Sequence, residues 1–198
     1  MIGRVRVISG IWRSRWVEFE EQDGLRPTPN RLRETLFNWL QPYIPGSYVL
    51  DLFAGSGVLG FEALSRGAAN VVAVEKNPVV VKRIQQQSVQ LNAKDFEIFQ
   101  ENALLWIRRF QPQKPFDGVF VDPPFELNLW GDVLEALHRP GLLAEHSWVY
   151  VERPRKVELD FWALGFSVLK DTTAGDVHIS LLTLQKDSVC EEKSSLGS

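Results

Sequence analysis

The 198-residue sequence has little of several features, and each shortage excludes a class of protein. It contains a single cysteine, Cys190, which excludes a framework of intrachain disulfides. No apolar run approaches the roughly 20 residues that a membrane-spanning helix needs. Residues 1–6 alternate charged and apolar side chains and so lack the continuous apolar core of a signal peptide. We therefore expect a soluble protein of the cytoplasm with no membrane partner.

Metal ligands and nucleophile triads are also missing. The three histidines, His138, His146 and His178, show no metal-ligand spacing, and there is no cysteine cluster, so we expect no metal. There is no Ser-His-Asp arrangement and no Walker loop. What is present is an ordinary globular composition, 44% hydrophobic and 24% charged, in a length that fits one domain with a small appendage.

Charge is unevenly distributed along the chain. Residues 1–33 hold seven arginines and four acidic residues, a net of +3, whereas the remainder has a net of −6. Trp12 and Trp16 interleave with Arg13 and Arg15 in this basic segment. Arginine binds phosphates bidentately and stacks on bases, so the segment favours a polyanionic partner contacted on one side. A solvated hairpin with ordinary surface arginines is the alternative.

The order of elements predicts an α/β fold. Residues 4–9 and 15–20 alternate as half-buried strands do, which predicts an N-terminal hairpin, and Thr28-Pro29 is typical of a helix start. Apolar strands then alternate with helices from residue 48 onward, which predicts an open, mostly parallel sheet covered on both faces. The expected strands are 48–53, 71–75, 96–99, 118–122 and 148–152, followed by an antiparallel pair near 166–170 and 177–184. A helix is expected after each of the first four strands. The first ends near residue 65, the second begins at Asn77-Pro78, and the other two cover 103–110 and 130–138.

We divide the chain into three segments. Residues 1–25 form a basic β-hairpin extension, 26–186 a Rossmann-like domain with a leading helix, and 187–198 a polar tail. Ligands of such sheets bind at the carboxyl ends of the strands, near the topological switch point. The polar residues expected at those ends are Asp51, Glu75, Asn102 and Asp122.

A glycine-rich turn follows the first strand of the sheet. Gly55, Gly57 and Gly60 match G-x-G-x-x-G between a strand and a helix, and Glu75 lies where an acid accepts hydrogen bonds from ribose hydroxyls. A dinucleotide places a pyrophosphate on such a helix end, whereas S-adenosylmethionine carries no phosphate and has an ammonium group. Asp51 favours that cation and repels a pyrophosphate. The turn therefore favours S-adenosylmethionine, with a dinucleotide or a purely structural turn as alternatives.

The segment Asp122-Pro123-Pro124-Phe125 follows the fourth strand of the sheet. The prolines make a stiff turn whose carbonyls accept hydrogen bonds, and the Asp122 carboxylate also accepts them. Converging acceptors suit a planar base with an exocyclic amine, because they direct its delocalised lone pair toward a methyl sulfonium. Stacking on Phe125 is worth roughly 1–3 kcal/mol. Either Asp122 or solvent takes the proton released by the product.

These motifs make the chain resemble a class I S-adenosylmethionine-dependent methyltransferase. More narrowly, it is similar to the bacterial small-subunit (16S) ribosomal RNA guanine-N2 methyltransferases, the RsmD family. The resemblance covers most of residues 1–125. The segments that carry it are the arginine-rich hairpin, Arg26-Pro27-Thr28 with residues 31 and 33–40, residues 51–68, and residues 122–125.

The resemblance implies a seven-stranded sheet with an antiparallel last strand. It implies methyl transfer from S-adenosylmethionine, with S-adenosylhomocysteine as product, to the N2 amine of one guanine in small-subunit rRNA within an assembling ribosomal particle. We expect a monomer. The same layout fits adenine-N6 DNA methyltransferases, which remain an alternative, as does a dinucleotide-binding oxidoreductase.

The resemblance also implies roles for individual residues. The catalytic tip would be Asp122, Pro123, Pro124 and Phe125. The methionine moiety would lie on Asp51, Phe53, Ala54, Gly55, Ser56 and Gly57, the ribose on Glu75 beside Asn77, and the adenine beside Asn102 and Ala103. An Asp is common at position 102 in these enzymes, so the Asn alters that contact. RNA would be contacted by Arg4, Arg6, Arg13, Arg15, Arg26, Thr28, Arg31 and Arg33.

Overall fold

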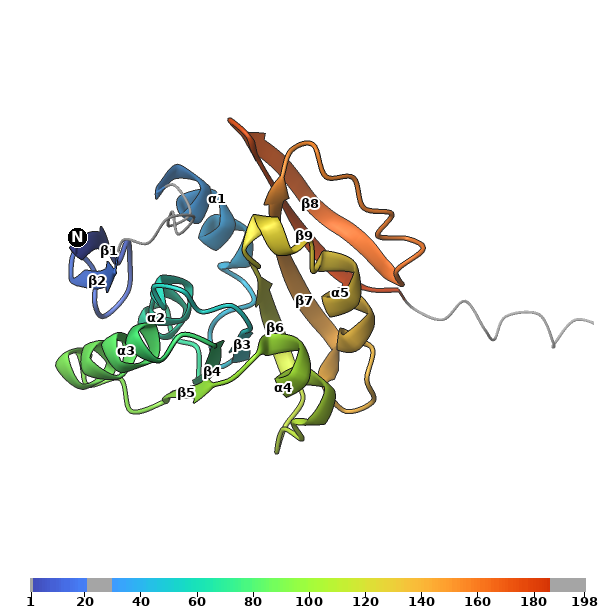
Figure 1. Cartoon of the computed structure of the whole chain (residues 1–198). Coiled ribbons are helices and arrows are strands. Elements are labelled where there is room, and N and C mark those ends of the chain that lie inside the picture. The colour runs from blue at the N-terminus through green and yellow to red at the C-terminus, as the bar shows by residue number, and fades with distance from the viewer. Residues whose placement is uncertain (1, 21–29, 186–198) are drawn as a thin grey trace, which may run out of the picture.

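The computed structural model describes residues 2–20 and 30–185. A seven-stranded sheet carries helices on both faces, and a separate two-stranded hairpin lies beside α2 and α3 (Figure 1). The hairpin consists of β1 (Ile2–Arg6) and β2 (Trp16–Glu20). The strands of the sheet are β3 (Tyr48–Asp51), β4 (Asn70–Glu75), β5 (Phe96–Gln100), β6 (Phe116–Val121), β7 (Leu143–Pro154), β8 (Phe166–Ala174) and β9 (Val177–Leu184). The helices are α1 (Asn30–Leu40), α2 (Val58–Ser65), α3 (Pro78–Leu91), α4 (Ala103–Arg109) and α5 (Trp130–Leu137), with a short 3-10 helix at Phe125–Leu127.

The sheet confirms the predicted Rossmann-like topology. Its strand order is β5-β4-β3-β6-β7-β9-β8, with β3 to β7 parallel and β9 antiparallel to both of its neighbours. The order reverses between β3 and β6, so the carboxyl ends of these two strands flank the topological switch point. Within the described residues, no helix combines the length and the apolar character that a bilayer crossing needs.

Two apolar cores lie on opposite faces of the sheet, because successive side chains of a strand point to opposite sides. Val49 packs in the core shared with α1, α2, α3 and the hairpin, and its neighbour Leu50 packs in the core shared with α4 and α5. Val71 and Val72 of β4 divide in the same way. The near-continuous apolar strands predicted from the sequence therefore serve two buried faces.

One glycine shows how closely two strands pack. A Cβ built on Gly118 of β6 would lie 2.0 Å from the indole of Trp148 on β7, so the ring occupies the space of the missing side chain. Trp148 is 2% exposed and also contacts Phe120, with ring centroids 5.1 Å apart. Glycine at position 118 therefore leaves the space in the core that Trp148, the bulkiest side chain of β7, occupies.

The hairpin differs from its prediction in the first strand. We expected strand 4–9, but β1 ends at Arg6, and residues 9–14 form bends and turns. The reason is tertiary, since α2 supplies the hydrogen-bond partners that a strand would have supplied. The N–H groups of Ile8 and Ser9 donate to Glu62, and the N–H of Trp12 donates to the Ser65 hydroxyl. The hairpin is thus held on the helix that follows the glycine turn.

Both predicted segment boundaries, at 25/26 and 186/187, lie outside the described residues, as does Cys190. The apolar side chains of the hairpin, including Val5, Val17 and Phe19, belong to the same core cluster as α1 and α2. The hairpin is therefore a separate sheet but shares its core with the larger domain.

Candidate active site

Four carboxyl side chains gather at one edge of the sheet. Asp51 ends β3, Glu75 ends β4, Asp122 directly follows β6, and Glu152 lies near the end of β7. Val121 pairs with Val151, so Asp122 and Glu152 are the next residues on two neighbouring parallel strands. In the described part of the chain, no three His, Cys, Asp or Glu side chains are placed to hold a metal ion together.

The Asp51 carboxyl is almost fully buried. It is 1% exposed, and its Oδ2 accepts a hydrogen bond of 3.2 Å from the Gly60 backbone N–H in α2. Burial raises its pKa to about 7; the Gly60 hydrogen bond opposes this rise and the Glu75 charge adds to it. An acid with such a pKa is poised to bind a cation, because a nearby positive charge recovers part of the cost of ionising it in this environment.

The predicted glycine turn has the backbone that glycine favours. Gly55 and Gly57 have φ angles of 51° and 75° in the left-handed region. Glu75 supports the turn from β4, because its Oε2 accepts a 3.1 Å hydrogen bond from the Gly55 N–H and its Oε1 accepts a 2.8 Å bond from the Asn77 N–H. A carboxylate offers about four lone-pair sites, so these two bonds leave capacity for a ligand.

The two asparagines predicted near the cofactor begin helices. The Asn77 Oδ1 accepts from the Val79 N–H and caps α3, as the Asn77-Pro78 pair predicted. The Asn102 Oδ1 accepts from the Leu105 N–H and caps α4, whose first residue Ala103 is buried. The cap uses the side-chain oxygen of Asn102, so the side-chain NH2 group remains for a contact with a base.

The Asp-Pro-Pro-Phe segment forms a short, rigid turn. The Pro124 carbonyl accepts a 3.0 Å hydrogen bond from the Leu127 N–H, which closes the 3-10 turn after β6. Phe125 is 38% exposed, and its ring lies 6.0 Å from that of the buried Trp130. Phe125 therefore presents an aromatic face beside Asp122.

Behind Asp122 lies a buried pair that the sequence motifs did not indicate. The Tyr150 hydroxyl donates a 2.7 Å hydrogen bond to Glu152 Oε2, and the Trp130 indole N–H donates 2.7 Å to the Glu152 carbonyl. Burial, then the charges of Glu152 and Asp51, raise the pKa of Asp122 well above its ordinary value. Burial and the Glu152 charge likewise raise the pKa of Tyr150, which keeps its hydroxyl a donor. The position of Glu152 at a predicted strand end was a signal that could have identified it.

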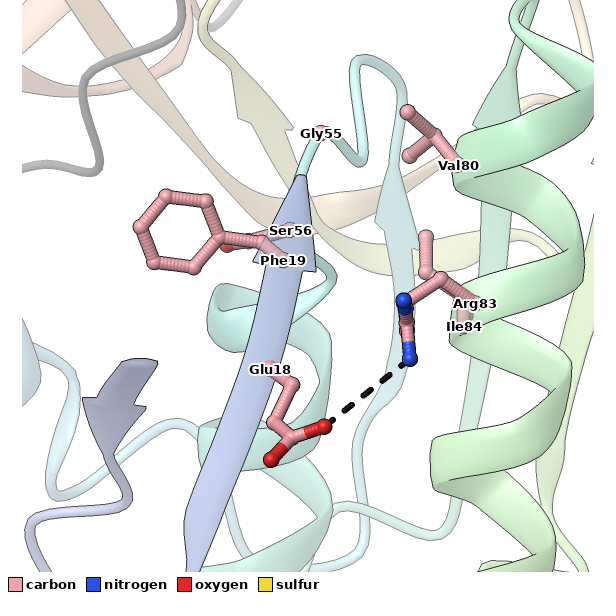
Figure 2. A pocket seen from close by; sticks show the side chains of 7 residues that line it. All are labelled: Glu18, Phe19, Gly55, Ser56, Val80, Arg83 and Ile84. Atoms are coloured by element: carbon pink, nitrogen blue, oxygen red, sulfur yellow. Dashed lines mark ion pairs between the residues drawn. The ribbon is translucent and has the colours of Figure 1, made fainter. Parts of the chain in front are cut away.

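The hairpin reaches the glycine turn. Figure 2 shows a small pocket between β2, the turn and α3, crossed by an ion pair of 3.8 Å between Arg83 Nη1 and Glu18 Oε2. The pocket is lined by Glu18, Phe19, Gly55, Ser56, Val80, Arg83 and Ile84. None of the four carboxyl residues lines it, although Gly55 in its wall donates a hydrogen bond to Glu75. The pocket lies where the hairpin packs against the glycine turn and α3.

Most arginines of the basic segment that the structure describes lie at the surface. Arg13, Arg15 and Arg31 are exposed. Arg4 is exposed but pairs with Glu18 at 2.9 Å, and Arg6 lies over the Trp16 ring at 4.4 Å. Arg26 and Thr28 lie outside the described residues.

Arg33 corrects the predicted RNA-contacting set. It is 0% exposed, and its Nη2 donates to the Arg6 carbonyl at 2.9 Å and to Asn30 Oδ1 at 2.8 Å. Burial lowers its pKa. A guanidinium enclosed in this way has no surface to offer a phosphate, so Arg33 joins α1 to the hairpin instead.

Comparison with known proteins identifies the family. A family model described as Conserved hypothetical protein 95 matches residues 5–183. The chain belongs to this family. The ribosomal RNA small subunit methyltransferase D of Haemophilus influenzae is 40% identical over 184 residues, which cover 90% of this chain and 93% of that protein. The protein of the same name from Escherichia coli K12 is 38% identical over 175 residues, 88% of this chain and 87% of its own.

Solved structures agree with this membership. The Escherichia coli protein yhhF has a TM-score of 0.84 at 34% identity and covers 92% of this chain and 99% of its own. A Haemophilus influenzae protein has a TM-score of 0.77 at 35% identity and covers 93% of this chain and 100% of its own. The predicted family resemblance and the predicted fold are confirmed.

The family's expected cofactor can be tested against the residues present. S-adenosylmethionine carries a sulfonium and an ammonium group and no phosphate. The four carboxyl residues at the carboxyl ends of the strands form an acidic cluster. Burial and the Glu75 charge raise the pKa of Asp51, and burial with the charges of Glu152 and Asp51 raises that of Asp122. Such a cluster fits a cationic ligand and opposes a pyrophosphate. The residues therefore fit S-adenosylmethionine better than a dinucleotide.

Proposed function

We propose that this protein transfers a methyl group from S-adenosylmethionine to the N2 amine of a guanine in small-subunit ribosomal RNA. The proposal rests on the acidic cluster at the switch point of the sheet, supported by relatives named for small-subunit rRNA. As the form of substrate we propose an assembling ribosomal particle, because the 19 described residues of the N-terminal segment offer little surface for reading sequence.

When bound, S-adenosylmethionine supplies an electrophilic methyl group. Asp51 and the turn from Phe53 to Gly57 would hold its amino acid portion, and the Asp51 carboxylate would balance the charge of the ammonium. Glu75 would accept hydrogen bonds from the ribose hydroxyls, and Asn102 with Ala103 would border the adenine. These roles are those that the family resemblance implies, and the residues lie at or shortly after the carboxyl ends of β3, β4 and β5, where ligands of such sheets bind.

Asp122 acts on the base. Its carboxylate and the Pro123 carbonyl accept the two hydrogens of the amine, which directs the nitrogen lone pair toward the methyl group. Phe125 stacks on the base and is 38% exposed for that contact. The raised pKa of Asp122 suits it to take the proton that the methylated amine releases.

A tritiated-methyl transfer assay tests the function. Bare small-subunit rRNA, small-subunit particles from cells lacking this modification, and unmethylated duplex DNA are offered in parallel, and the products are digested to nucleosides. We expect N2-methylguanosine from the particles. N6-methyladenine from the DNA, or no transfer to any substrate, would contradict the proposal.

The variant Asp122→Asn tests the division of roles. It keeps the size of the side chain but removes the charge that orients the amine, so methyl transfer should fall by about 100-fold or more. The affinity for S-adenosylmethionine should stay within about threefold, because Asp122 belongs to the base side of the site. A folded variant that loses cofactor binding in proportion to activity would contradict this division.

A further inference from the structure

Tyr150 and Glu152 form a hydrogen-bonded pair on β7, and none of the roles proposed above involves them. Both side chains are buried, at 0% and 4% exposed, and lie on the strand next to Asp122. Trp148, Tyr150 and Glu152 alternate along β7 on the face that carries Phe120 of β6, and Asp122 directly follows the end of β6. Glu152 therefore lies beside the catalytic tip at the same edge of the sheet.

This carboxylate is held in a fixed position. Tyr150 donates its hydroxyl to Oε2 at 2.7 Å, and Trp130 donates to the backbone carbonyl of the same residue at 2.7 Å. A buried carboxylate costs folding free energy through desolvation, and here the neighbouring Asp122 adds repulsion. A buried carboxylate beside a second carboxyl group destabilises the fold, which points to a use in binding.

Guanine presents complementary chemistry. Its Watson–Crick edge carries the N1–H donor directly beside the N2 amine, and bases extruded into enzyme pockets are read along this edge. Adenine and 2,6-diaminopurine carry a lone pair at N1 instead. A second hydrogen-bond acceptor beside the one that binds the amine therefore favours guanine. It disfavours a purine with an unprotonated N1.

We propose that Glu152, oriented by Tyr150, accepts the N1–H of the target guanine while Asp122 holds its N2 amine. This inference rests on the proposed function and deepens it, because it assigns the choice of base to a residue outside the Asp-Pro-Pro-Phe segment. Glu152 is the residue that contacts the base, and Tyr150 is a positioning residue that acts through it.

The test compares two bases at one position. Small-subunit rRNA is assembled by ligation with either guanosine or 2,6-diaminopurine riboside at the methylated position and reconstituted into particles. Both bases carry the 2-amine that receives the methyl group, and they differ at N1 and at the 6-substituent. We expect the wild type to prefer guanosine by at least about 100-fold in kcat/KM.

The variant Glu152→Gln should reduce this preference for guanosine. Its amide can donate to an N1 lone pair, so the ratio of guanosine to diaminopurine kcat/KM should fall by about 100-fold. Tyr150→Phe, which leaves the carboxylate but removes its orienting hydroxyl, should lower the ratio by about 10-fold. A ratio is independent of the fraction of folded enzyme, so partial misfolding of a variant does not affect the result.

Glu145→Gln is the matched control. Its side chain is 83% exposed, and it should leave both activities and their ratio at the wild-type values. If Glu152→Gln lowers activity on both bases equally, the proposed base contact is wrong and Glu152 is structural. If the wild type methylates neither base in the particle, the proposed function itself has failed, and the two failures are thereby distinguished.

Discussion

Glu62 Oε2 on α2 accepts a 2.7 Å hydrogen bond from the backbone N–H of Ile8, 54 residues away. The other oxygen of the same carboxylate accepts from the Ser9 N–H at 3.0 Å and pairs with Arg66 Nε at 2.7 Å. Glu62 is 0% exposed. One buried side chain thus joins the basic hairpin to the helix that follows the cofactor turn.

Glu62→Gln should loosen the hairpin without damaging the cofactor site. An amide NH2 would face an N–H donor, and leaving a buried donor unsatisfied costs roughly 1–3 kcal/mol. Urea unfolding should show this loss of stability. Methyl transfer to particles should fall by about 10-fold, because a loosened hairpin misplaces the substrate. Affinity for S-adenosylmethionine, measured by calorimetry, should be unchanged. Glu101→Gln, which breaks only the surface pair with Arg109, is the control and should cost under about 1 kcal/mol.

Arg13 and Arg15 are expected to contact phosphates. Replacing both by alanine should reduce the slope of log affinity against log salt for small-subunit rRNA by about 2, because each arginine accounts for about one phosphate. Filter binding over a range of salt concentrations measures this slope. Arg108→Ala, at an exposed position of α4, should leave it unchanged. An unaltered slope in the double variant would remove Arg13 and Arg15 from the RNA interface.

Arg33→Ala should separate stability from RNA binding. The side chain is fully buried and bonds to the Arg6 carbonyl, so its removal should cost roughly 2–4 kcal/mol of unfolding free energy. The salt slope for rRNA should stay at the wild-type value, in contrast to Arg13 and Arg15. A reduced slope at full stability would restore Arg33 to the RNA-contacting set.

Asp51→Asn should stabilise the ligand-free protein above neutral pH. The folded-state pKa of about 7 exceeds the ordinary aspartate value of 3.8, so Asp51 favours folding at low pH and loses that contribution as pH rises through 7. The variant should therefore exceed the wild type by roughly 1–4 kcal/mol at pH 8, and the two should converge near pH 4. Denaturant unfolding across this range measures the difference. The same variant should bind S-adenosylmethionine about 10- to 100-fold more weakly at pH 8.

Two glycine substitutions should have opposite effects on stability. Gly118→Ala places a methyl group 2.0 Å from the Trp148 ring and should cost at least about 3 kcal/mol. Gly131 lies in α5, where a methyl group on its Cα would have no neighbouring atom within 4 Å, so Gly131→Ala should gain about 0.5–1 kcal/mol. Thermal unfolding compares them directly, and equal effects would contradict the packing described for β6 and β7.

The sequence by itself determined the parallel sheet, its order of elements and three of the four acids at its edge. Near-continuous apolar strands need two covered faces, glycines at 55 and 57 permit a left-handed turn, and Asn77-Pro78 caps a helix through local hydrogen bonds. These effects operate within a few residues of the chain, so composition and spacing reveal them. The strand 177–184 was likewise predicted with the bounds of β9.

Only the tertiary structure decided which charged residues are enclosed. Arg33 and Arg31 are two residues apart and equally basic, yet the hairpin covers one and leaves the other exposed. The end of β1 depends on Glu62 and Ser65, more than 50 residues away along the chain. Glu152 ends a predicted strand, but its place beside Asp122 depends on the register in which β6 and β7 pair. Burial and the pairing of distant strands set the solvation and partners of a charge, and neither is a property of its local sequence.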